Sequence, residues 1–515
     1  MTLPFRTASR GQPLVESVSR LPASASPALA MEFAPVEEWE RTARELRRRD
    51  GAAFVDLFAG PSGADGSVAL TLLLTRHDQR DWLALRDVLP PGATYPTLTG
   101  TFPAADWYER EAFEVAGLIP LGHPHLRALG HGSRHTAETL LADSPLAPAS
   151  PGVVDYPLGP VRSGVVESGH YTLRSVGEEI IDVRLQLAWK HRGVEAMATG
   201  MDPAQLPLLA ERISGTDAVA HGLACATGLE ALAGLVPSPR AQQLRLIAAE
   251  LERLHDHAAF GADVCQATGL AVAQAQYEIV RERLLRLGAR LTGHRYLFGF
   301  VLPGGVAADL DDALLRDLVA TVGEARRDLM ALGALAAASG SHMDRLRTAG
   351  RLTLEAADDL ALTGPVARAT GLDTDARRDV PYGGYASIPV AVALGKGGDA
   401  AARAAVRHDE SLVAADLILR AAGEVEPGPA AVVPRLGGLA LRPDAVGLGW
   451  SEGSRGTEVH WIETDAASRV VRYRVRSASF ACWQGFARSI PGGNILTDFP
   501  IIEQSFGLSY AGSDR

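Results

Sequence analysis

The apolar periodicity in the middle of the chain limits its fold more than any other feature of the sequence. Ser238 and Pro239 form a pair that is typical of a helix cap and first helical turn. Apolar residues then recur every three or four positions, first at Leu244, Ile247, Leu251 and Leu254 and again at Val280, Leu284, Leu287 and Leu291. Helices with such faces are stable when the faces pack together. The sequence therefore predicts a helical bundle in the middle of the chain.

Further helices and strands are predicted before this bundle. Residues 36–49 have helical spacing, and residues 68–75 have the composition of a short apolar strand. Residues 178–187 alternate in the manner of a strand, and residues 188–199 then return to helical spacing. The first half of the chain is therefore predicted to mix helices and strands.

Near the end of the chain, residues 457–463 and 469–476 predict a two-stranded ribbon. Valine and tyrosine side chains alternate on one side of its second strand, and Arg472, Arg474 and Arg476 lie on the other. We expect these arginines to be solvated, and contact with an acidic partner is the alternative.

These elements together predict an α+β fold, in which a small N-terminal α+β domain precedes a mainly helical-bundle domain with peripheral β-strands. The 515 residues leave room for two to four domains of roughly 100–200 residues each. The predicted divisions are a loose leader at 1–30, the small domain at 31–129, a linker at 130–154 and the large domain at 155–515.

Composition excludes several classes of function. The net charge is −11 and no dense basic stripe occurs, which argues against a nucleic-acid binder. No run approaches the roughly 18 consecutive apolar residues of a membrane span, so any membrane association is expected through partners. The widely spaced Cys225, Cys265 and Cys482 indicate neither a disulfide framework nor an iron–sulfur cluster held by this chain alone. A reducing, cytoplasmic setting follows, although the Arg content of the leader leaves organelle targeting open.

Three segments carry the most specific signal. Residues 191–195 read His-Arg-Gly-Val-Glu, residues 212–221 read Arg-Ile-Ser-Gly-Thr-Asp-Ala-Val-Ala-His, and residues 505–515 read Ser-Phe-Gly-Leu-Ser-Tyr-Ala-Gly-Ser-Asp-Arg. They resemble the large subunit of membrane-bound [NiFe]-hydrogenases and its relative, the 49-kDa-type subunit of respiratory complex I. The resemblance implies a chain that works inside a membrane-attached redox complex.

The metal ligands of the hydrogenases are missing from these segments. In that family, four cysteines in Arg-Ile-Cys-Gly-x-Cys-x-x-x-His and Asp-Pro-Cys-x-x-Cys hold nickel and iron. The four matching positions, which we call the ligand positions, are Ser214, Asp217, Ser509 and Gly512. Soft thiolates are needed to hold nickel at such a site, and hydroxyl oxygens replace them poorly. The sequence therefore predicts no bound metal and no hydrogenase chemistry.

Complex I offers a second comparison. Its quinone-binding tyrosine falls at Gly215, and its histidine-rich hairpin falls at residues 159–166, where Arg162 replaces a histidine. His170 lies four residues beyond this hairpin. A quinone remains a candidate acceptor, although the residues that usually reduce it are absent.

Residues 102–117, followed by His123 and Pro124, resemble the 30-kDa-type subunit of complex I. In the family this segment docks on the 49-kDa-type partner, and fused versions of the two subunits are known. The resemblance implies that Glu109, Arg110, Glu111, His123 and Pro124 lie at an interface between domains or subunits.

Glu195, Asp217 and His221 are the predicted catalytic residues. The resemblance implies that Glu195 relays protons, because the acid of Arg-Gly-x-Glu does so in the hydrogenases, and an ion pair with His191 is the alternative. Asp217 and His221 are four residues apart, so on a helix they share a face, where an aspartate can orient a histidine. The alternative is a buried hydrogen bond that holds the helix start.

The other predicted pocket residues are polar or small and come from several segments. Arg162 and Arg212 could present cations to a head group, an acidic side chain or a neighbouring subunit, or could form structural ion pairs. Glu452 and Arg455 belong to a segment that resembles the Glu-x-x-Arg-Gly of the family, followed by His460. The full predicted set is Arg162, His170, Arg212, Ser214, Gly215, Glu452, Arg455 and Ser509.

Other motifs are assigned structural roles. Residues 498–500 are expected to form a turn, and the segments around Arg377, Arg403 and Glu410 are expected to build the bundle. His123, His125, His131 and His135 lack the compact ligand spacing of a zinc site. Glycines at 447 and 449 lack the third glycine of a dinucleotide motif, and 395–396 lack the spacing of a phosphate loop.

These observations predict a fused subunit of a complex-I-like or formate-hydrogenlyase-like membrane oxidoreductase on the cytoplasmic face of the membrane. It would pass electrons from a small iron–sulfur subunit to a quinone-type acceptor with proton coupling. Antiporter-like membrane subunits are the other expected partners. No cofactor is expected on this chain alone, and NAD(H) would act only at the level of the complex. The alternative is a non-catalytic subunit that couples conformational changes.

Overall fold

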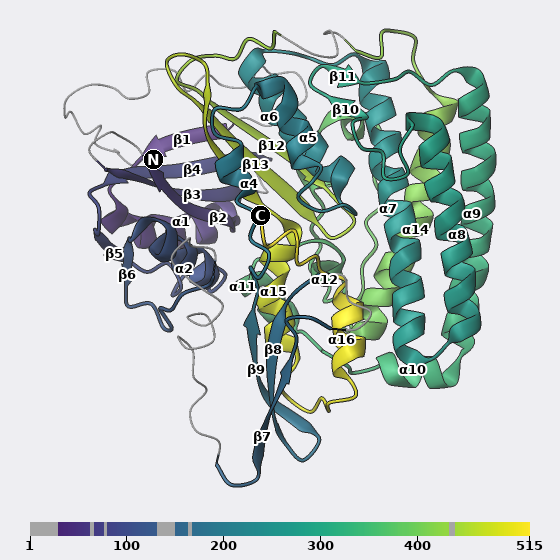
Figure 1. Cartoon of the computed structure of the whole chain (residues 1–515), viewed down its shortest axis with the longest axis horizontal. Coiled ribbons are helices and arrows are strands. Elements are labelled where there is room, and N and C mark those ends of the chain that lie inside the picture. Colours follow the sequence, from purple (N-terminus) through teal and green to yellow (C-terminus); the bar gives the residue numbers. More distant parts are fainter. Residues whose placement is uncertain (1–28, 62–65, 77–79, 131–149, 163–166, 432–437) are drawn as a thin grey trace.

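The structure is a computed structural model that describes residues 29–61, 66–76, 80–130, 150–162, 167–431 and 438–515 (Figure 1). An N-terminal unit lies on one side of the picture, a long helical bundle lies on the other, and small sheets and the C-terminal segment lie between them. The predicted α+β class, with a helical bundle and peripheral strands, is confirmed. None of the described helices is long and apolar enough to cross a membrane.

The N-terminal unit is built on a sheet in the order β1-β4-β3-β2. Its strands are β1 (Leu29–Phe33), β2 (Ala52–Pro61), β3 (Val68–Arg76) and β4 (Asp81–Leu89). Strand β1 runs parallel to β4, and the other pairs are antiparallel. The other elements of this unit are α1 (Trp39–Asp50), β5 (Thr94–Pro96), α2 (Ala105–Ala116) and β6 (Ile119–Leu121).

Both faces of this sheet are buried, which explains why β3 is almost continuously apolar. Leu72 and Leu74 face the core that contains Trp39 of α1 and Tyr108 of α2. Leu73 and Trp82 point to the opposite face and join the core of the large unit. The N-terminal unit is therefore packed firmly against the rest of the chain.

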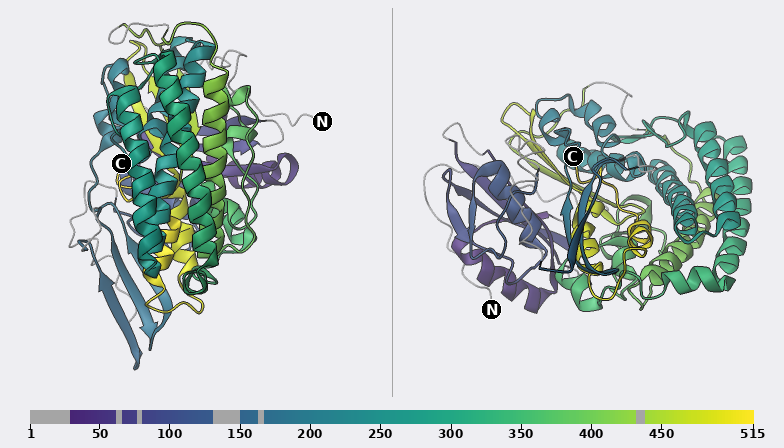
Figure 2. Two further views of the ribbon diagram at one scale, coloured as in Figure 1. Left: turned by 90° about the vertical axis from the view of Figure 1, so that its right-hand side faces the viewer. Right: turned by 60° about the horizontal axis from the view of Figure 1, so that its bottom comes forward.

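The bundle consists of α7 (Pro239–Thr268), α8 (Ala271–Thr292), α9 (Asp312–Ala338) and α14 (Ala400–Gly423) (Figure 2). Ser238 accepts a hydrogen bond from the backbone N–H of Ala241, so the predicted cap of α7 is confirmed. Leu244, Ile247, Leu251 and Leu254 are buried in its core.

Two small antiparallel sheets and several helices connect the units. Strands β7 (Val153–Leu158), β8 (His170–Val176) and β9 (Glu179–Gln186) project from the body in Figure 1, and β12 (Val446–Glu452), β13 (Thr457–Thr464) and β14 (Val470–Arg476) pack on the N-terminal sheet. The main connecting helices are α6 (Ala218–Ala233), α15 (Ala478–Ser489) and α16 (Phe499–Phe506). The remaining elements are η1 (Val36–Glu38), α4 (Val194–Met197), η2 (Pro203–Gln205), α5 (Leu206–Ala210), β10 (Val301–Leu302), β11 (Gly305–Val306), α10 (Gly340–Leu346), α11 (Leu354–Asp359), α12 (Gly364–Arg368), α13 (Ala376–Asp379) and η3 (Gly383–Ala386).

Two local predictions are wrong. Residues 188–199 do not form one helix, because Ala188 and Gly193 adopt positive φ angles of 63° and 66° and only Val194–Met197 is helical. The terminal ribbon has a third strand, β12, which includes the two glycines at 447 and 449. Residues 1–28 of the predicted leader and 131–149 of the predicted linker lie outside the described residues.

The close approach of α6 to β12 explains these glycines. A Cβ atom on Gly449 would overlap the carbonyl oxygen of Ala224 in α6, and one on Gly447 would overlap that of Gly228. Glycine therefore permits backbone contact between the helix that follows Asp217 and the hairpin that carries Arg455 and His460.

Candidate functional site

The structure brings the two segments that carry the ligand positions together. The guanidinium of Arg192 donates to the carbonyl oxygens of Ile213 and Ala511 at 2.8 Å and 3.0 Å. Arg455 forms a second connection, since its Nε donates to the carbonyl oxygen of Gly507 at 2.7 Å and its Nη1 contacts Asp217. Segments almost 300 positions apart in the sequence therefore meet as the resemblance implied.

A buried ion-pair cluster occupies this meeting point. Arg455 donates to both carboxylate oxygens of Asp217 at 2.9 Å and 3.0 Å, and to Asp256 of α7 at 3.2 Å. Ser214 donates to Asp217 at 2.9 Å, and Ser454 donates to Asp256 at 2.6 Å. We call these five residues the Asp217–Arg455 cluster.

The electrostatics of the cluster favour a paired, charged state. Burial alone would raise the pKa of Asp256, but the Arg455 charge and the Ser454 hydroxyl lower that pKa to about 2. Burial alone would lower the pKa of Arg455, but the charges of Asp217 and Asp256 raise it above its ordinary value. A buried arginine between two carboxylates satisfies the requirement that buried charges be paired.

The ligand positions do not fit a nickel ion. Asp217 is engaged by Arg455 and Ser214, and Gly512 has no side chain. The hydroxyl of Ser509 accepts a hydrogen bond from the backbone N–H of Gly512 at 3.1 Å. A cationic guanidinium beside the second ligand position also opposes a metal cation. The prediction that the chain binds no nickel therefore rests on the chemistry of these donors.

Asp217 and His221 interact electrostatically: burial lowers the pKa of His221, and the charge of Asp217 opposes that shift. Among the described residues, however, no hydrogen bond joins the two side chains. The carboxylate of Asp217 is used by the cluster, and the side chain of His221 turns to β13 instead. Its Nδ1 lies 3.0 Å from Nε2 of His460, and its Nε2 lies 3.7 Å from Glu458. Nδ1 of His460 lies 2.7 Å from the hydroxyl of Tyr473. We call Glu458, His221, His460 and Tyr473 the histidine chain.

Burial sets the protonation of this chain. It lowers the pKa of His221 to about 4 and holds the pKa of His460 well below its ordinary value. Burial also raises the pKa of Glu458 well above the usual range. Hydrogen bonds therefore join His221, His460 and Tyr473, and Glu458 lies 3.7 Å from the far ring nitrogen of His221. This series begins one helical turn from Asp217.

Glu252 of α7 fixes the helix that presents His221. Its carboxyl oxygens accept hydrogen bonds from the backbone N–H groups of Val219 and Ala220, at 2.7 Å and 3.0 Å. These are N–H groups of the first turn of α6, which have no partner within the helix. Neither Glu252 nor Asp256 was predicted from the sequence, because both lie on α7, where the apolar periodicity indicates only a helix of the bundle core.

Glu195 lies beside the C-terminal segment. It accepts hydrogen bonds from the backbone N–H of Val475 at 3.0 Å and from Nε of Arg515 at 2.9 Å, and its side chain is 29% exposed. Burial and the charge of Arg515 lower the pKa of His191, and the charge of Glu195 opposes this shift only in part. The role of Glu195 as a proton relay remains a prediction.

The other predicted pocket residues are distributed around the cluster. Arg162 donates to Glu503 and to the hydroxyl of Tyr510, next to Ser509. Arg212 is exposed and stacks its guanidinium 4.6 Å from the ring of Phe298, and Gly215 is also exposed.

Two further predicted residues, His170 and Glu452, contact other groups. His170 starts β8, where its ring lies 6.2 Å from that of Trp189 and bonds with Gln186. Glu452 accepts from Arg368 at 2.8 Å within a separate buried ion-pair network. That network comprises Glu250, Arg253, Arg368, Asp375, Arg377, Glu410 and Glu452.

The predicted interface residues divide into two groups. Glu111 accepts from Arg474 and Arg515 of the large unit, so it does lie between the units. Glu109, Arg110 and His123 instead bond inside the N-terminal unit, to the hydroxyl of Thr97, the carbonyl oxygen of Ala128 and the carbonyl oxygen of Asp106 in α2, respectively. Pro124 is exposed. Of the histidines considered for zinc, His131 and His135 lie outside the described residues.

The expectation that the arginines of β14 are solvated is wrong. Arg474 is buried and donates to Asp56 and Glu111 of the N-terminal unit, each through two contacts of 2.9 Å. Arg476 donates to the carbonyl oxygen of Val55, and Arg472 stacks over Phe58. The acidic partner of this face belongs to the same chain.

Comparisons with known proteins agree with this arrangement. Residues 34–148 match the family described as Respiratory-chain NADH dehydrogenase, 30 Kd subunit, and residues 265–437 match the corresponding 49 Kd subunit. Formate hydrogenlyase subunit 5 of Escherichia coli (strain K12) is 32% identical over 467 residues, which cover 84% of this chain and 79% of the relative. An NADH-quinone oxidoreductase subunit of Rhodopseudomonas palustris (strain BisB18) is 29% identical over 81% of each chain.

The fold also matches a solved structure. A chain of the membrane-bound sulfane sulfur reductase, an archaeal respiratory membrane complex, superimposes with a TM-score of 0.67 and 24% identity. The match covers 72% of this chain and all of the other. The chain therefore belongs to the family that unites the fused 30-kDa and 49-kDa subunits of respiratory NADH dehydrogenase with the large subunits of formate-hydrogenlyase-type hydrogenases, as a complex-I-like or hydrogenase-like subunit without cysteine at the four ligand positions.

Proposed function

We propose that the chain is an oxidoreductase subunit that works without nickel inside a multisubunit respiratory complex. Electrons from an iron–sulfur cluster in a small partner subunit would reach a quinone-type acceptor held near the ligand positions. The observation that carries this proposal is the Asp217–Arg455 cluster, in which Arg455 forms an ion pair with Asp217 of one ligand segment and donates to the carbonyl oxygen of Gly507 in the other. NAD(H) would react only elsewhere in the complex.

Proton transfer belongs to the histidine chain in this proposal. Each neutral imidazole offers one N–H donor and one acceptor nitrogen, so the chain can accept a proton at one end and release one at the other. His221 lies one helical turn from Asp217, and the carboxyl of Glu458 lies 3.7 Å from its Nε2. The chain could therefore supply protons to an acceptor reduced beside the cluster. Glu195 would serve the same acceptor from the side of the C-terminal segment.

The assembly follows from the same family. We propose that antiporter-like membrane subunits anchor the complex and that this chain lies on the cytoplasmic face of the membrane. The exposed Arg212 and Gly215, on the loop that leads to Asp217, are the proposed contact for the iron–sulfur partner. Such a contact would bring the donor cluster to the ligand positions.

The test replaces the two imidazoles in the intact complex. His221→Gln and His460→Gln keep hydrogen-bonding side chains but cannot pass a proton as imidazole does. Electron transfer to a soluble quinone should fall about 100-fold, within the range for loss of a proton-transfer group. His125→Gln is the matched control, because His125 is an exposed histidine of the N-terminal unit.

A second candidate function is conformational coupling without chemistry. The buried ion-pair network around Arg368 favours it, since Arg368 contacts Asp375, Glu410 and Glu452 from three different segments and could transmit movement between them. Unchanged electron transfer and proton coupling in His221→Gln, His460→Gln and Glu195→Gln, with the complex still assembled, would favour coupling and reject the catalytic proposal.

A further inference from the structure

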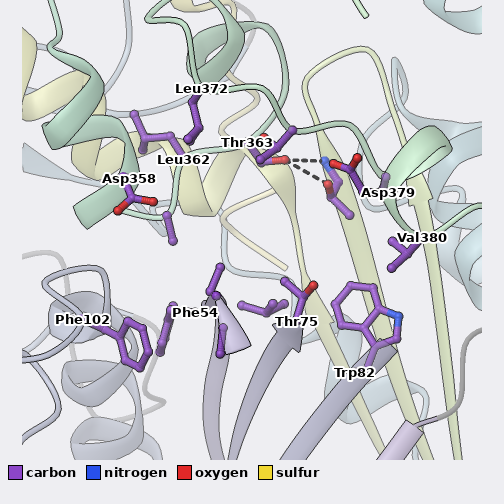
Figure 3. Close-up of a pocket in the computed structure, with 18 of the residues that line it drawn as sticks. Phe54, Thr75, Trp82, Phe102, Asp358, Leu362, Thr363, Leu372, Asp379 and Val380 are labelled. Atoms are coloured by element: carbon purple, nitrogen blue, oxygen red, sulfur yellow. Dashed lines mark hydrogen bonds between the residues drawn. The ribbon is translucent and has the colours of Figure 1, made fainter. Parts of the chain in front are cut away.

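A cavity of about 330 Å³ lies between the N-terminal unit and the large unit. Figure 3 shows Phe54, Thr75, Trp82 and Phe102 on the side of the N-terminal sheet, with residues such as Leu362 facing them from the large unit. A cavity of roughly 150 Å³ is enough to hold benzene in other proteins. This interdomain cavity therefore has room for a larger ring system.

The walls are preformed by contacts between the units. Arg47 of α1 donates to Asp358 at 2.7 Å and to Asp359 at 3.2 Å, and its guanidinium stacks over Phe102. Arg476 of β14 donates to the carbonyl oxygens of Val55 and Thr457. A ligand would enter a space whose two sides are already fixed, which limits the entropy lost on binding.

Two buried polar atoms at this cavity lack partners. Among the described residues, neither the Thr75 hydroxyl oxygen nor the Trp82 indole nitrogen has a hydrogen-bond partner. Figure 3 shows the Thr75 hydroxyl pointing from β3 toward the space below Thr363. The indole can only donate, and the threonine hydroxyl is free to donate. A ligand with an acceptor oxygen would provide a partner for the Thr75 hydroxyl, whose burial without a hydrogen bond is unfavourable.

The charges at the cavity favour a neutral ligand. Asp358, Asp375 and Asp379 line it, but each is already paired with an arginine: Arg47, Arg377 and Arg378, respectively. Thr363 and Thr457 hydrogen-bond with each other, and Thr457 also donates to Glu452. The three carboxylates are thus neutralised, and Arg476, which also lines the cavity, donates to the carbonyl oxygens of Val55 and Thr457. The aromatic walls suit a flat ring.

We propose that the interdomain cavity binds a neutral, flat and mostly apolar molecule that carries a carbonyl oxygen. The carbonyl accepts a hydrogen bond from Thr75, and the ring packs between Phe54, Trp82 and Leu362. This inference does not depend on the proposed function.

A ligand here would also touch the hairpin that holds the cluster. Thr457, in the cavity wall, is two residues from Arg455, which contacts Asp217. The backbone N–H of Gly453 donates to the carbonyl oxygen of Gly456 at 2.7 Å, so this turn is closed by its own hydrogen bond. A ligand in the cavity would therefore contact the β12–β13 hairpin, whose turn carries Arg455 of the cluster.

The experiment uses the full chain and two bicyclic probes that differ by one carbonyl oxygen, α-tetralone and tetralin. Calorimetry should give an affinity for α-tetralone about tenfold higher than for tetralin, the effect of one hydrogen bond. Thr75→Val should remove that difference. Thr71→Val is the matched control, because Thr71 is buried in the same strand without a partner for its hydroxyl but does not line the cavity.

A second measurement needs no change at Thr75. The indole N–H resonance of Trp82, assigned by its loss in Trp82→Phe, should shift when α-tetralone is added to the unmodified protein. Absence of this shift, equal affinities for the two probes, or the same loss in Thr71→Val as in Thr75→Val would each overturn the proposal.

Discussion

At the scale of single residues, the four ligand positions hold serine, aspartate, serine and glycine instead of the cysteines of the hydrogenases. An aspartate at the second ligand position gives Arg455 a buried counter-ion, and Asp256 provides another. Removing one member of such a group leaves a buried charge unpaired, which is strongly unfavourable. Asp217 therefore forms an ion pair at a position where the resemblance to the hydrogenases would place a metal ligand.

A buried carboxyl in the N-terminal unit makes stability depend on pH. Burial raises the pKa of Glu109 from 4.5 to about 7 although Thr97 and Leu98 donate to it. Its contribution is complete below the unfolded pKa of 4.5 and is lost as the pH rises through 7, a change of about 3 kcal/mol at 1.36 kcal/mol per unit. Glu109→Gln should reduce the fall in melting temperature between pH 5 and pH 8. An unchanged pH dependence would refute the assignment.

At the scale of elements, the packing of α6 on the β12–β13 hairpin determines the site. One element carries His221 and follows Asp217, and the other carries Arg455, Glu458 and His460. Their backbones meet at Gly447 and Gly449, so the distance between the two sets of side chains depends on the absence of a Cβ atom at both positions.

Gly449→Ala tests this packing. The added Cβ overlaps the carbonyl oxygen of Ala224, so α6 must move away from β12. We expect a loss of about 1–3 kcal/mol, as for other overpacked interiors, together with a change in the histidine resonances of His221 and His460. Gly423→Ala, at the end of α14 where a Cβ meets nothing within 4 Å, is the control and should be neutral or stabilising. Equal effects of the two substitutions would contradict the account.

The sequence predicted the elements better than their contacts. Periodicity was enough for the bundle and for β3, because a buried face repeats along one segment. It could not identify Asp256, Glu458 or the partners of Arg474, since these contacts join segments hundreds of positions apart. The prediction of a helix at 188–199 was wrong because Ala188 and Gly193 adopt positive φ angles, which the spacing of apolar residues does not reveal.

At the scale of the whole molecule, buried ion pairs hold the two units together. Arg474 links β14 to Asp56 and Glu111, and Arg86 links β4 to Glu463. Glu111 also contacts Arg515, whose other partner is Glu195. The interface between the units is thus connected to the C-terminal segment that carries Ser509.

Arg474→Ala should weaken the interface between the N-terminal unit and the large unit. It leaves Asp56 and Glu111 without their shared cation, and breaking a buried pair costs about 3–5 kcal/mol. The variant should melt at a lower temperature and be cleaved by protease between the units. Arg469→Ala serves as the control, because Arg469 is 72% exposed and pairs with Asp465 at the surface, where about 0–1 kcal/mol is expected. Similar melting temperatures for the two variants would argue against the interface described.

The most direct measurement of the central claim is the metal content of the purified, active complex. Elemental analysis combined with an electron-transfer assay should find nickel far below one atom per chain while activity is retained, because Asp217 is paired with Arg455 and no ligand position offers a thiolate. Stoichiometric nickel that is lost together with activity on chelation would contradict the account.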